Sequence, residues 1–410
     1  MIRKAILAAW LAIVCSLSLT AEEIEIEIRN PVDWARPAAP VVIERKSLNI
    51  PAGQTVVAVA DTKGGHDWPR PFQLDDLDED GEWDELFFQV NIGPEDRVSI
   101  RVGIGPKPDK PPQFPKRVDA IIDAQPGPRT VIKPAWESEL AGYCTYGCTQ
   151  MDVLGKIQPR LVLDYYYGKE PHSQHHFTPE YGQDYLLTAN TMGAHAIFVR
   201  EADGRIARPW TTNAYAIGGK LERDAKYDSK VLASGPLRAL VRTRISNWVT
   251  DAGEYECAIL YSIAALQRHT GVSLRFSKMP GDGKALQIGA GMRRMYEDVH
   301  FRKYPEYMTA LARDVLEGGI VDRYVARAIL APRRYTMQAI DIPDDPGLKL
   351  MPRNGPNYGL LFPKGMREVR YAFVTAWEKD GGVTSLDQWE EFLARLSDEL
   401  EFPPEVRIRR

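Results

Sequence analysis

Three of the chain's seven histidines fall within five residues, in the stretch HSQHHFTPEYGQDY. His172, His175 and His176 are followed at once by Tyr181 and Asp184. Imidazoles beside a carboxylate can bind a transition metal, although this spacing differs from the usual helical or cysteine-paired ligand patterns. A histidine and a tyrosine can instead carry out acid–base catalysis at neutral pH. A polar surface loop is the third interpretation, and the sequence leaves all three open.

A pair of carboxylates lies upstream, in the stretch AWESELAGY. Glu137 and Glu139 are two residues apart, so on a strand they share one face with their Cα atoms about 6.5–7 Å apart. Glycoside hydrolysis needs two carboxylates at about this separation, but two neighbours on one strand flank a scissile bond poorly. A solvated strand face is the alternative. Trp136 beside them is either a platform on which a sugar ring stacks or a core residue.

Further candidates follow in MDVLGK and TMGAHAIF, which contain Asp152, Lys156 and His195. Elimination of a uronate sugar needs a base for the proton next to the carboxylate and a cation or hydrogen bonds that neutralise that carboxylate. His, Tyr, Lys and Arg can fill these roles at neutral pH. Lys156 is therefore a candidate for the cation, with an ordinary surface lysine as the alternative.

An acidic segment, DDLDEDGEWDELFF, resembles the first half of a calcium loop, with aspartates at alternate positions before a glycine. It departs from an EF-hand because position twelve is Phe87 rather than Glu. A solvated acidic turn is the alternative to a structural calcium site. The candidate ligands are Asp76, Asp78, Asp80 and Asp84.

The elements that must position these residues are mostly strands. The stretch EIEIEIRN alternates strictly over residues 23–29, and many short β-branched runs are bounded by Gly, Pro or Asp. A capping box at Ser385 and Gln388 predicts a C-terminal helix, and RKYPEYMTALARDVLEGG indicates a second helix over residues 302–319. The sequence predicts a mainly β fold: a large antiparallel β-sandwich, of which the supersandwich is one form, with a smaller N-terminal β unit and a C-terminal helix.

Composition shifts suggest the domain boundaries. A basic, then apolar N-terminal stretch predicts a signal peptide over residues 1–21. Residues 22–104 would form the N-terminal β unit with the Asp-rich loop. The Pro-rich segment at residues 105–117 would be a linker, and residues 118–410 the main sandwich domain.

Charge and export narrow the partners. The formal net charge of -4 provides no overall basic field for nucleic acid. No run after the signal is long and apolar enough to span a membrane, so we expect a secreted or periplasmic protein.

Export permits disulfides. Cys144 and Cys148 flank a three-residue turn that suits a bridge, with free buried cysteines as the alternative. Cys257 would be left over.

Several blocks resemble, in the same order, the secreted bacterial family catalogued as domain of unknown function 4861 (DUF4861). The similarity covers roughly residues 56–400, and WESE, DVLGK and SGPLR are its most specific parts. Such proteins are typical of polysaccharide-utilisation gene sets, and the resemblance therefore implies a role in carbohydrate metabolism without defining a reaction. By position, the family pattern includes Glu137, Glu139, Asp152, Lys156, His176, Tyr181 and Asp184.

The chain departs from the family pattern at the turn CTYGCTQ, which replaces a longer turn containing Arg and Asp.

We expect a carbohydrate-active enzyme that cuts acidic, uronate-containing oligosaccharides by β-elimination or hydrolysis. His176, Tyr181 and Lys156 are the expected catalytic residues, and the only expected cofactor is structural calcium. A non-catalytic glycan-binding protein is the alternative. The expected substrate-binding residues are Trp136, Glu137, Glu139, Asp152, Asp184 and His195.

Overall fold

The computed structural model is mainly β, as the sequence predicts, with several antiparallel sheets and a C-terminal helix. It divides into two compact units, Met1–Pro115 with Pro404–Arg410, and Lys116–Pro403. The signal-peptide prediction lies outside the described residues. The structure describes residues 22–63, 66–125, 131–145, 150–168, 171–173, 177–186, 188, 191–209, 225–294, 297–303, 307–313, 315–316, 319–320, 325–342 and 357–409.

The smaller unit contains two antiparallel sheets. The five-stranded sheet has the order β28 (Glu405–Arg409), β1 (Glu22–Arg29), β7 (Arg97–Pro106), β3 (Gln54–Lys63) and β4 (His66–Pro69). The three-stranded sheet has the order β2 (Arg36–Glu44), β6 (Glu85–Ile92) and β5 (Phe72–Asp75), and the short helix α2 (Arg45–Leu48) follows β2.

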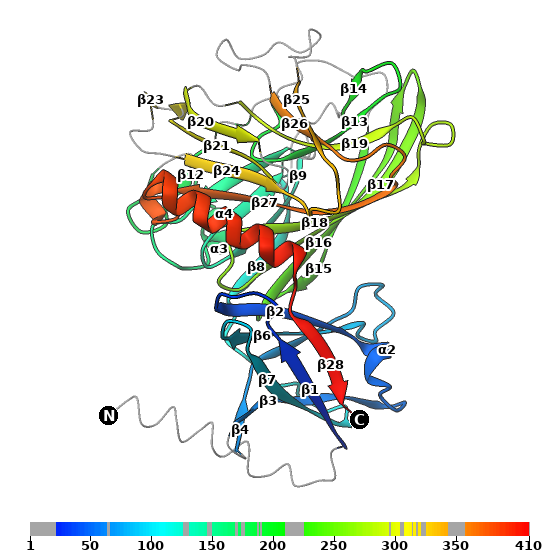
Figure 1. Ribbon diagram of the computed structural model, residues 1–410, viewed down its shortest axis with the longest axis vertical. Helices are drawn as coiled ribbons and strands as arrows, with labels where there is room; N and C mark the ends of the chain where they lie inside the picture. The colour runs from blue at the N-terminus through cyan, green and yellow to red at the C-terminus, as the bar shows by residue number, and fades with distance from the viewer. Residues whose placement is uncertain are drawn as a thin grey trace. The chain divides into compact units, whose positions relative to one another are not determined.

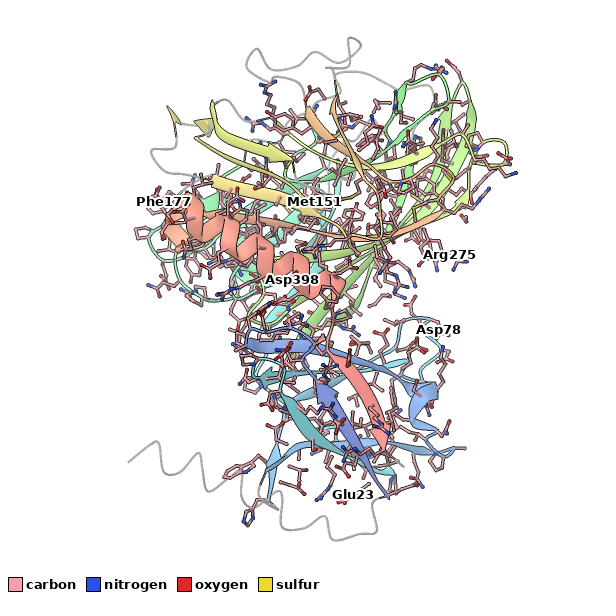
Figure 2. All side chains as sticks on the ribbon, in the orientation of Figure 1. Glu23, Asp78, Met151, Phe177, Arg275 and Asp398 are labelled. Carbon is pink, nitrogen blue, oxygen red and sulfur yellow. The ribbon has the colours of Figure 1, made fainter. Side chains whose placement is uncertain are left out.

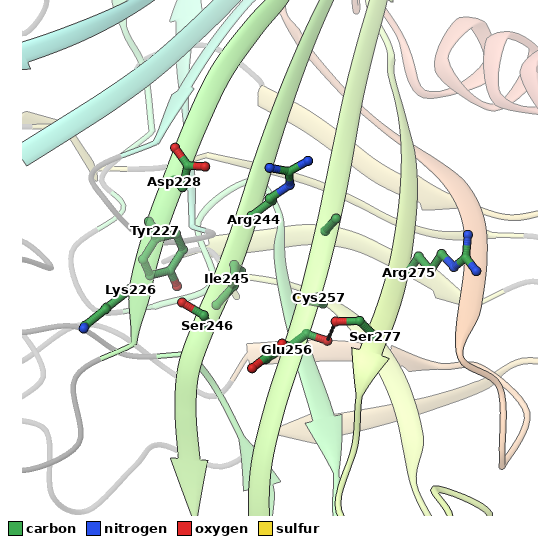
Figure 3. A pocket seen from close by; sticks show the side chains of 11 residues that line it. Lys226, Tyr227, Asp228, Arg244, Ile245, Ser246, Glu256, Cys257, Arg275 and Ser277 are labelled. Atoms are coloured by element: carbon green, nitrogen blue, oxygen red, sulfur yellow. Dashed lines mark hydrogen bonds between the residues drawn. The ribbon is translucent and has the colours of Figure 1, made fainter. Parts of the chain in front are cut away.

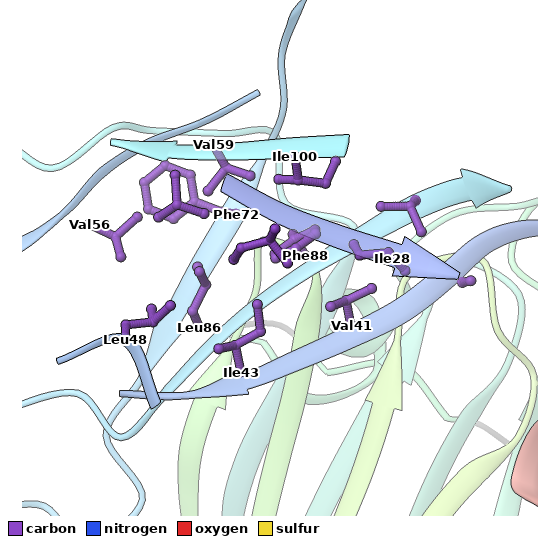
Figure 4. Packing of buried hydrophobic residues seen from close by; sticks show 14 of the residues in the cluster. Ile28, Val41, Ile43, Leu48, Val56, Val59, Phe72, Leu86, Phe88 and Ile100 are labelled. Carbon is purple, nitrogen blue, oxygen red and sulfur yellow. The ribbon is translucent and has the colours of Figure 1, made fainter. Parts of the chain in front are cut away.

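Alternation along β1 builds one wall of this unit's core. Ile26 and Ile28 are completely buried. Figure 4 shows Ile28 and Ile100 meeting Phe88 and Val41 from the second sheet, all within one apolar cluster. The period of two therefore separates a core face from a charged face, as the sequence pattern predicts.

The C-terminal strand belongs to this smaller unit rather than to the larger one. β28 pairs antiparallel with β1, with Ile26 opposite Ile408. The sequence instead predicts one domain over residues 118–410, because a local pattern cannot show which distant edge a terminal strand will join. The Pro-rich segment packs on the same unit, where the Phe114 ring meets Phe72 edge-on at 5.5 Å.

The larger unit is organised around an eight-stranded antiparallel sheet. Its long neighbouring strands β16 (Arg238–Thr250) and β17 (Gly253–Ala264) form a hairpin. Their pairing runs from Arg238–Ala264 to Thr250–Gly253, with one register shift between Ile245 and Trp248. The strand order is β15 (Lys226–Ser234), β16 (Arg238–Thr250), β17 (Gly253–Ala264), β18 (Thr270–Lys278), β27 (Glu368–Trp377), β24 (Val325–Leu330), β21 (Tyr307–Arg313) and β20 (Glu297–Lys303).

Two five-stranded sheets pack on one face of this long sheet. The first has the order β12 (Gln183–Asp184), β11 (Met151–Gly155), β10 (Gly142–Thr145), β9 (Val131–Ser138) and β8 (Val118–Gln125). The second has the order β14 (Ile206–Ala207), β13 (Ala196–Arg200), β19 (Gln287–Met292), β26 (Asn357–Leu361) and β25 (Gln338–Ile342). Tyr143 of β10 meets Phe373 of β27 edge-on at 5.0 Å, which ties the first sheet to the long sheet.

The predicted C-terminal helix is confirmed as α4 (Leu386–Glu401). Ser385 is its N-cap and accepts a hydrogen bond from the Gln388 backbone N–H at 3.2 Å. Trp389 packs with alanines and valines of β24 and β27 and donates to the Thr309 hydroxyl at 2.8 Å. Figure 1 shows α4, in red, lying across these strands. The helix thus covers the other face of the long sheet at one end.

The second predicted helix, over residues 302–319, is wrong. β21 occupies Tyr307–Arg313 and pairs with both β20 and β24. Ala, Leu, Met and Arg favour helix locally, but pairing on two edges overrides that small preference. The remaining regular elements are α3 (Leu163–Tyr167), η1 (Glu378–Asp380), β22 (Val315–Leu316) and β23 (Gly319–Ile320). Among the described residues, no helix has the length and apolar character of a membrane span.

Candidate functional site

Glu137 and Lys156 form an ion pair inside the larger unit. Their side chains are 0% and 1% exposed, and the Lys156 amino group donates directly to Glu137. The pair links the end of β9 to the residue that follows β11. Because burial removes water from both charges, each charge is stable here only while its ion-pair and hydrogen-bond partners are in place.

The Lys156 amino group has its three N–H donors directed at protein oxygens. They bind Glu137, the Ser138 carbonyl and the Arg160 carbonyl, the last at 2.8 Å. An ammonium group has only three donors. In this conformation Lys156 therefore has no donor left for a substrate carboxylate, which argues against its expected catalytic role.

Glu137 also holds the start of α3. Its carboxylate accepts the backbone N–H groups of Val162 and Leu163 at 2.8 Å. Burial raises the pKa of Glu137 and lowers the pKa of Lys156, and in each case the charge of the partner opposes the effect. These contacts fix a buried corner of the fold.

Glu139, Asp152 and Asp184 are also buried and hydrogen-bonded. Glu139 pairs with Arg117 and accepts the Leu266 backbone N–H at 2.9 Å. Asp152 accepts from the Thr188 hydroxyl at 3.0 Å, and Asp184 accepts the Leu186 backbone N–H at 2.9 Å. In the structure these carboxylates hold loops and neighbouring strands together through hydrogen bonds and an ion pair.

Trp136 lies in the core, which excludes it as a surface platform in this conformation. It is 0% exposed, stacks on Tyr261 at 4.6 Å and donates to the Thr270 hydroxyl at 3.0 Å. The ring therefore lies between β9 and the long sheet. Of the two sequence interpretations, the structure supports the core residue.

His195 is likewise enclosed. It is 0% exposed, stacks on Phe373 at 4.6 Å, and its Nε2 lies 2.6 Å from the Tyr371 hydroxyl. Burial lowers the pKa of His195 to about 3. The imidazole is therefore neutral near pH 7, and its packing argues against direct contact with a sugar.

Tyr181 occupies a different environment, in a partly exposed column of stacked groups. Its ring lies parallel to Tyr165 with centroids 3.8 Å apart, and Tyr165 lies parallel to His172 at 4.1 Å. The guanidinium carbon of Arg160 lies 4.3 Å from the Tyr181 centroid. Two groups this close to the centre of one ring would collide if they lay on the same face. The order is therefore Arg160–Tyr181–Tyr165–His172, and we call these four residues the aromatic column.

The aromatic column gathers a cation, two phenols and an imidazole at the surface. His172 is exposed, and the Arg160 side chain is 34% exposed and paired with Glu180 at 2.8 Å. The hydrogen bond that Arg160 donates to the Glu180 carboxylate raises the pKa of Arg160. Figure 2 shows Phe177, which is 44% exposed, at the outer edge of the larger unit, while Met151 is buried.

Only part of this column is predicted by the sequence. Tyr181 and His172 are among the candidate residues, whereas Arg160 and Tyr165 are not. The run YYY at residues 165–167 was a usable signal, because an aromatic cluster rarely stays solvated without a packing partner. His175 and His176 lie outside the described residues, so the catalytic role of His176 remains a prediction. Cys148 also lies outside them, and the predicted disulfide with it.

The Asp-rich loop brings three of its four candidate ligands together. One carboxylate oxygen from each of Asp76, Asp78 and Asp84 lies within 4.8 Å of the others, whereas Asp80 is not part of that group. Hard carboxylate oxygens are the ligands that calcium prefers. Asp76 and Asp84 also accept backbone N–H groups of the loop, including those of Gly81 and Leu77. The donor set fits calcium, although those hydrogen bonds already hold the loop.

Comparison with known proteins decides the family. A family model described as "Domain of unknown function (DUF4861)" matches residues 28–406. The chain belongs to the DUF4861 family. No curated protein shows significant sequence similarity to this DUF4861 chain.

Solved structures show a distant likeness to the DUF4861 chain. One is a protein in glycosyl hydrolase family 38 from Enterococcus faecalis, with 8% identity, a TM-score of 0.44, and coverage of 95% of this chain and 47% of that one. Another is an alpha-mannosidase from Enterococcus faecalis V583, with 9% identity, a TM-score of 0.42, and coverage of 95% and 46%. The chain spans about half the length of these structures.

Proposed function

We propose that this protein is exported and acts on acidic, uronate-containing oligosaccharides at the aromatic column. The observation that carries the proposal is the placement of Arg160 against the Tyr181 ring, with His172 at the other end of the column. The export part rests on the N-terminal basic and apolar stretch.

The column provides the groups that β-elimination needs. A guanidinium can bind a uronate carboxylate through two parallel hydrogen bonds. Arg160 is now held by Glu180, but that carboxylate is 64% exposed. An exposed ion pair contributes about 0–1 kcal/mol, so a substrate carboxylate can replace Glu180 at little cost. Tyr181, together with His176 from the same stretch, would then move protons.

Elimination is better supported than hydrolysis among the described residues. Hydrolysis needs one carboxylic acid and one carboxylate on opposite sides of the glycosidic bond. Glu137 and Glu139 are buried and already bonded to Lys156 and Arg117. Elimination needs no such pair, and its cation and its phenol are both at the surface.

Glycan binding without catalysis is the second candidate. The exposed outer face of His172 and the exposed Phe177 ring provide apolar surface for a sugar. The two functions differ in one measurable product, because elimination alone creates an unsaturated uronate that absorbs in the ultraviolet.

We also propose that the Asp-rich loop binds calcium in a structural role. Asp76, Asp78 and Asp84 would hold the ion. Its contribution would be to stabilise the loop between β5 and β6 rather than to take part in chemistry.

The decisive experiment incubates the full chain with uronate oligosaccharides and follows both ultraviolet absorbance and new reducing ends. We expect Tyr181→Phe and His176→Ala to lower kcat by about 10²–10⁴-fold, the usual contribution of acid–base groups. Arg160→Gln should mainly raise KM. Arg205→Gln is the matched control, because Arg205 is also an exposed arginine paired with acids, Asp203 and Asp251.

Two results would contradict the proposal, one against catalysis and one against the aromatic column as its site. Binding without either signal would leave the glycan-binding protein. Full turnover in Tyr181→Phe and Arg160→Gln would remove the aromatic column from the proposal, whatever the activity of the wild type.

A further inference from the structure

The outward face of β15–β18, at the end of the long sheet away from α4, contains a pocket of about 550 Å³. This volume lies within the range of about 300–1,000 Å³ that is typical of small-ligand sites. Figure 3 shows the side chains that line it rising from four neighbouring strands. The outward-facing residues of the pocket are Lys226, Asp228, Arg244, Ser246, Glu256, Ala258, Arg275 and Ser277.

Strand register places two arginines on either side of a small residue. Arg244 on β16 lies opposite Ala258 on β17, and Ala258 lies opposite Arg275 on β18. Neighbouring strands are about 4.8 Å apart, so the two arginine backbones are separated by about 10 Å. Figure 3 shows Arg244 and Arg275 on the two sides of β17. Ala258 leaves the space between them open.

Neither guanidinium has an ion-pair or hydrogen-bond partner within the described part of the chain, and the same holds for Lys226. Other basic residues on this face differ. Arg370 pairs with Glu368 at 3.4 Å, and Lys278 pairs with Glu254. Arg244 and Arg275 can therefore turn toward the floor at Ala258 without breaking an ion pair or a hydrogen bond.

The same pocket contains acceptors as well as cations. Asp228 and Glu256 contribute carboxylates, and Ser246 and Ser277 contribute hydroxyls. The Ser277 hydroxyl donates to the Glu256 backbone carbonyl at 3.3 Å, and Glu256 is among the residues that line the pocket. A purely anionic ligand would be repelled by these carboxylates, whereas a molecule with one acidic group and several hydroxyls would use both kinds of group.

We propose that this pocket is a binding subsite for an acidic sugar residue. Its carboxylate or sulfate ester would bind Arg244 and Arg275, and its hydroxyls would donate to Asp228 and Glu256. This inference deepens the proposed function and rests on it only for the sugar class. The subsite lies on β15–β18, whereas the aromatic column is built from residues 160–181, so the two can be tested separately.

Calorimetric titration of the full chain with three probes tests the subsite. The probes are tri-galacturonate, its fully methyl-esterified neutral form, and a sulfated galactan trisaccharide. The proteins are the wild type, Arg244→Gln/Arg275→Gln, and the control Arg370→Gln, which removes one charge from the same face at a paired arginine. All three variant positions are exposed, so circular dichroism should show unchanged folding.

We expect the double variant to weaken binding of an acidic probe by about tenfold or more, because hydrogen bonds to charged groups are among the stronger ones. Arg370→Gln should stay within about twofold of the wild type. Preference for tri-galacturonate or for the sulfated probe identifies the acidic group. Equal binding of the neutral ester, no binding of any probe, or full affinity in the double variant would each overturn the subsite. Failure of the proposed function would be seen in a different experiment, as full turnover of uronate oligosaccharides by Tyr181→Phe.

Discussion

Lys156 and Glu137 form an ion pair that solvent does not reach, and each also binds backbone groups of the α3 region. The pair therefore joins β9, the end of β11 and the start of α3. A charge placed this deeply is tolerated only while its partner remains.

Lys156→Met should lower the free energy of unfolding by about 3–5 kcal/mol, because it leaves a buried carboxylate without its cation. Glu137→Gln/Lys156→Met should recover much of that loss. The glutamine carbonyl can still accept from Val162 and Leu163, and no charge remains. Urea unfolding measures both. A single variant as stable as the wild type would contradict the structural role.

Local patterns predicted the elements better than they predicted which side chains are accessible. β1 and α4 follow directly from periods of two and of three to four residues. On β9, however, Trp136 faces the long sheet and Glu137 faces the opposite side, and both are 0% exposed. The first five-stranded sheet is covered on both faces, so alternation no longer separates core from surface.

The aromatic column shows the same limit at the candidate site. Tyr165 and Tyr181 are far apart in sequence, and they stack only because the loop after α3 folds back on it. Residue types marked the stretch from His172 to Asp184 as chemical. The partner Arg160 depends on tertiary contacts that no local pattern contains.

Trp136→Leu should destabilise the fold by about 3 kcal/mol or more, through lost packing on Tyr261 and a cavity. Sugar affinity of the folded fraction should be unchanged. Trp68→Ala is the control, because that indole is 62% exposed and its removal should change stability by less than about 0.5 kcal/mol. Urea midpoints give the comparison, and loss of affinity in folded Trp136→Leu would restore the platform hypothesis.

The free energy of unfolding should decrease as pH falls from about 6.5 toward 3, because His195 is buried in its neutral form. The folded imidazole has a pKa of about 3, below its ordinary value of 6.5, so the unfolded chain binds the proton first. The full loss, about 5 kcal/mol at most, would be reached near pH 3. His195→Gln should reduce this slope but not remove it, because burial also lowers the pKa of His269, to about 4. Tyr371→Phe, which keeps the imidazole, should preserve the slope. Equal slopes in His195→Gln and the wild type would refute the assignment.

Calcium should raise the thermal unfolding temperature, and Asp78 should matter for that rise while Asp80 should not. Both side chains are exposed, and each accepts one backbone N–H of the loop, from Asp80 and from Glu82. Only Asp78 belongs to the three-carboxylate group. Calcium at tenfold its dissociation constant should add about 1.4 kcal/mol to the stability of the wild type and of Asp80→Asn. The gain should shrink in Asp78→Asn and disappear with a chelator. An equal gain in both variants, or none in the wild type, would show that the acidic loop is a solvated turn.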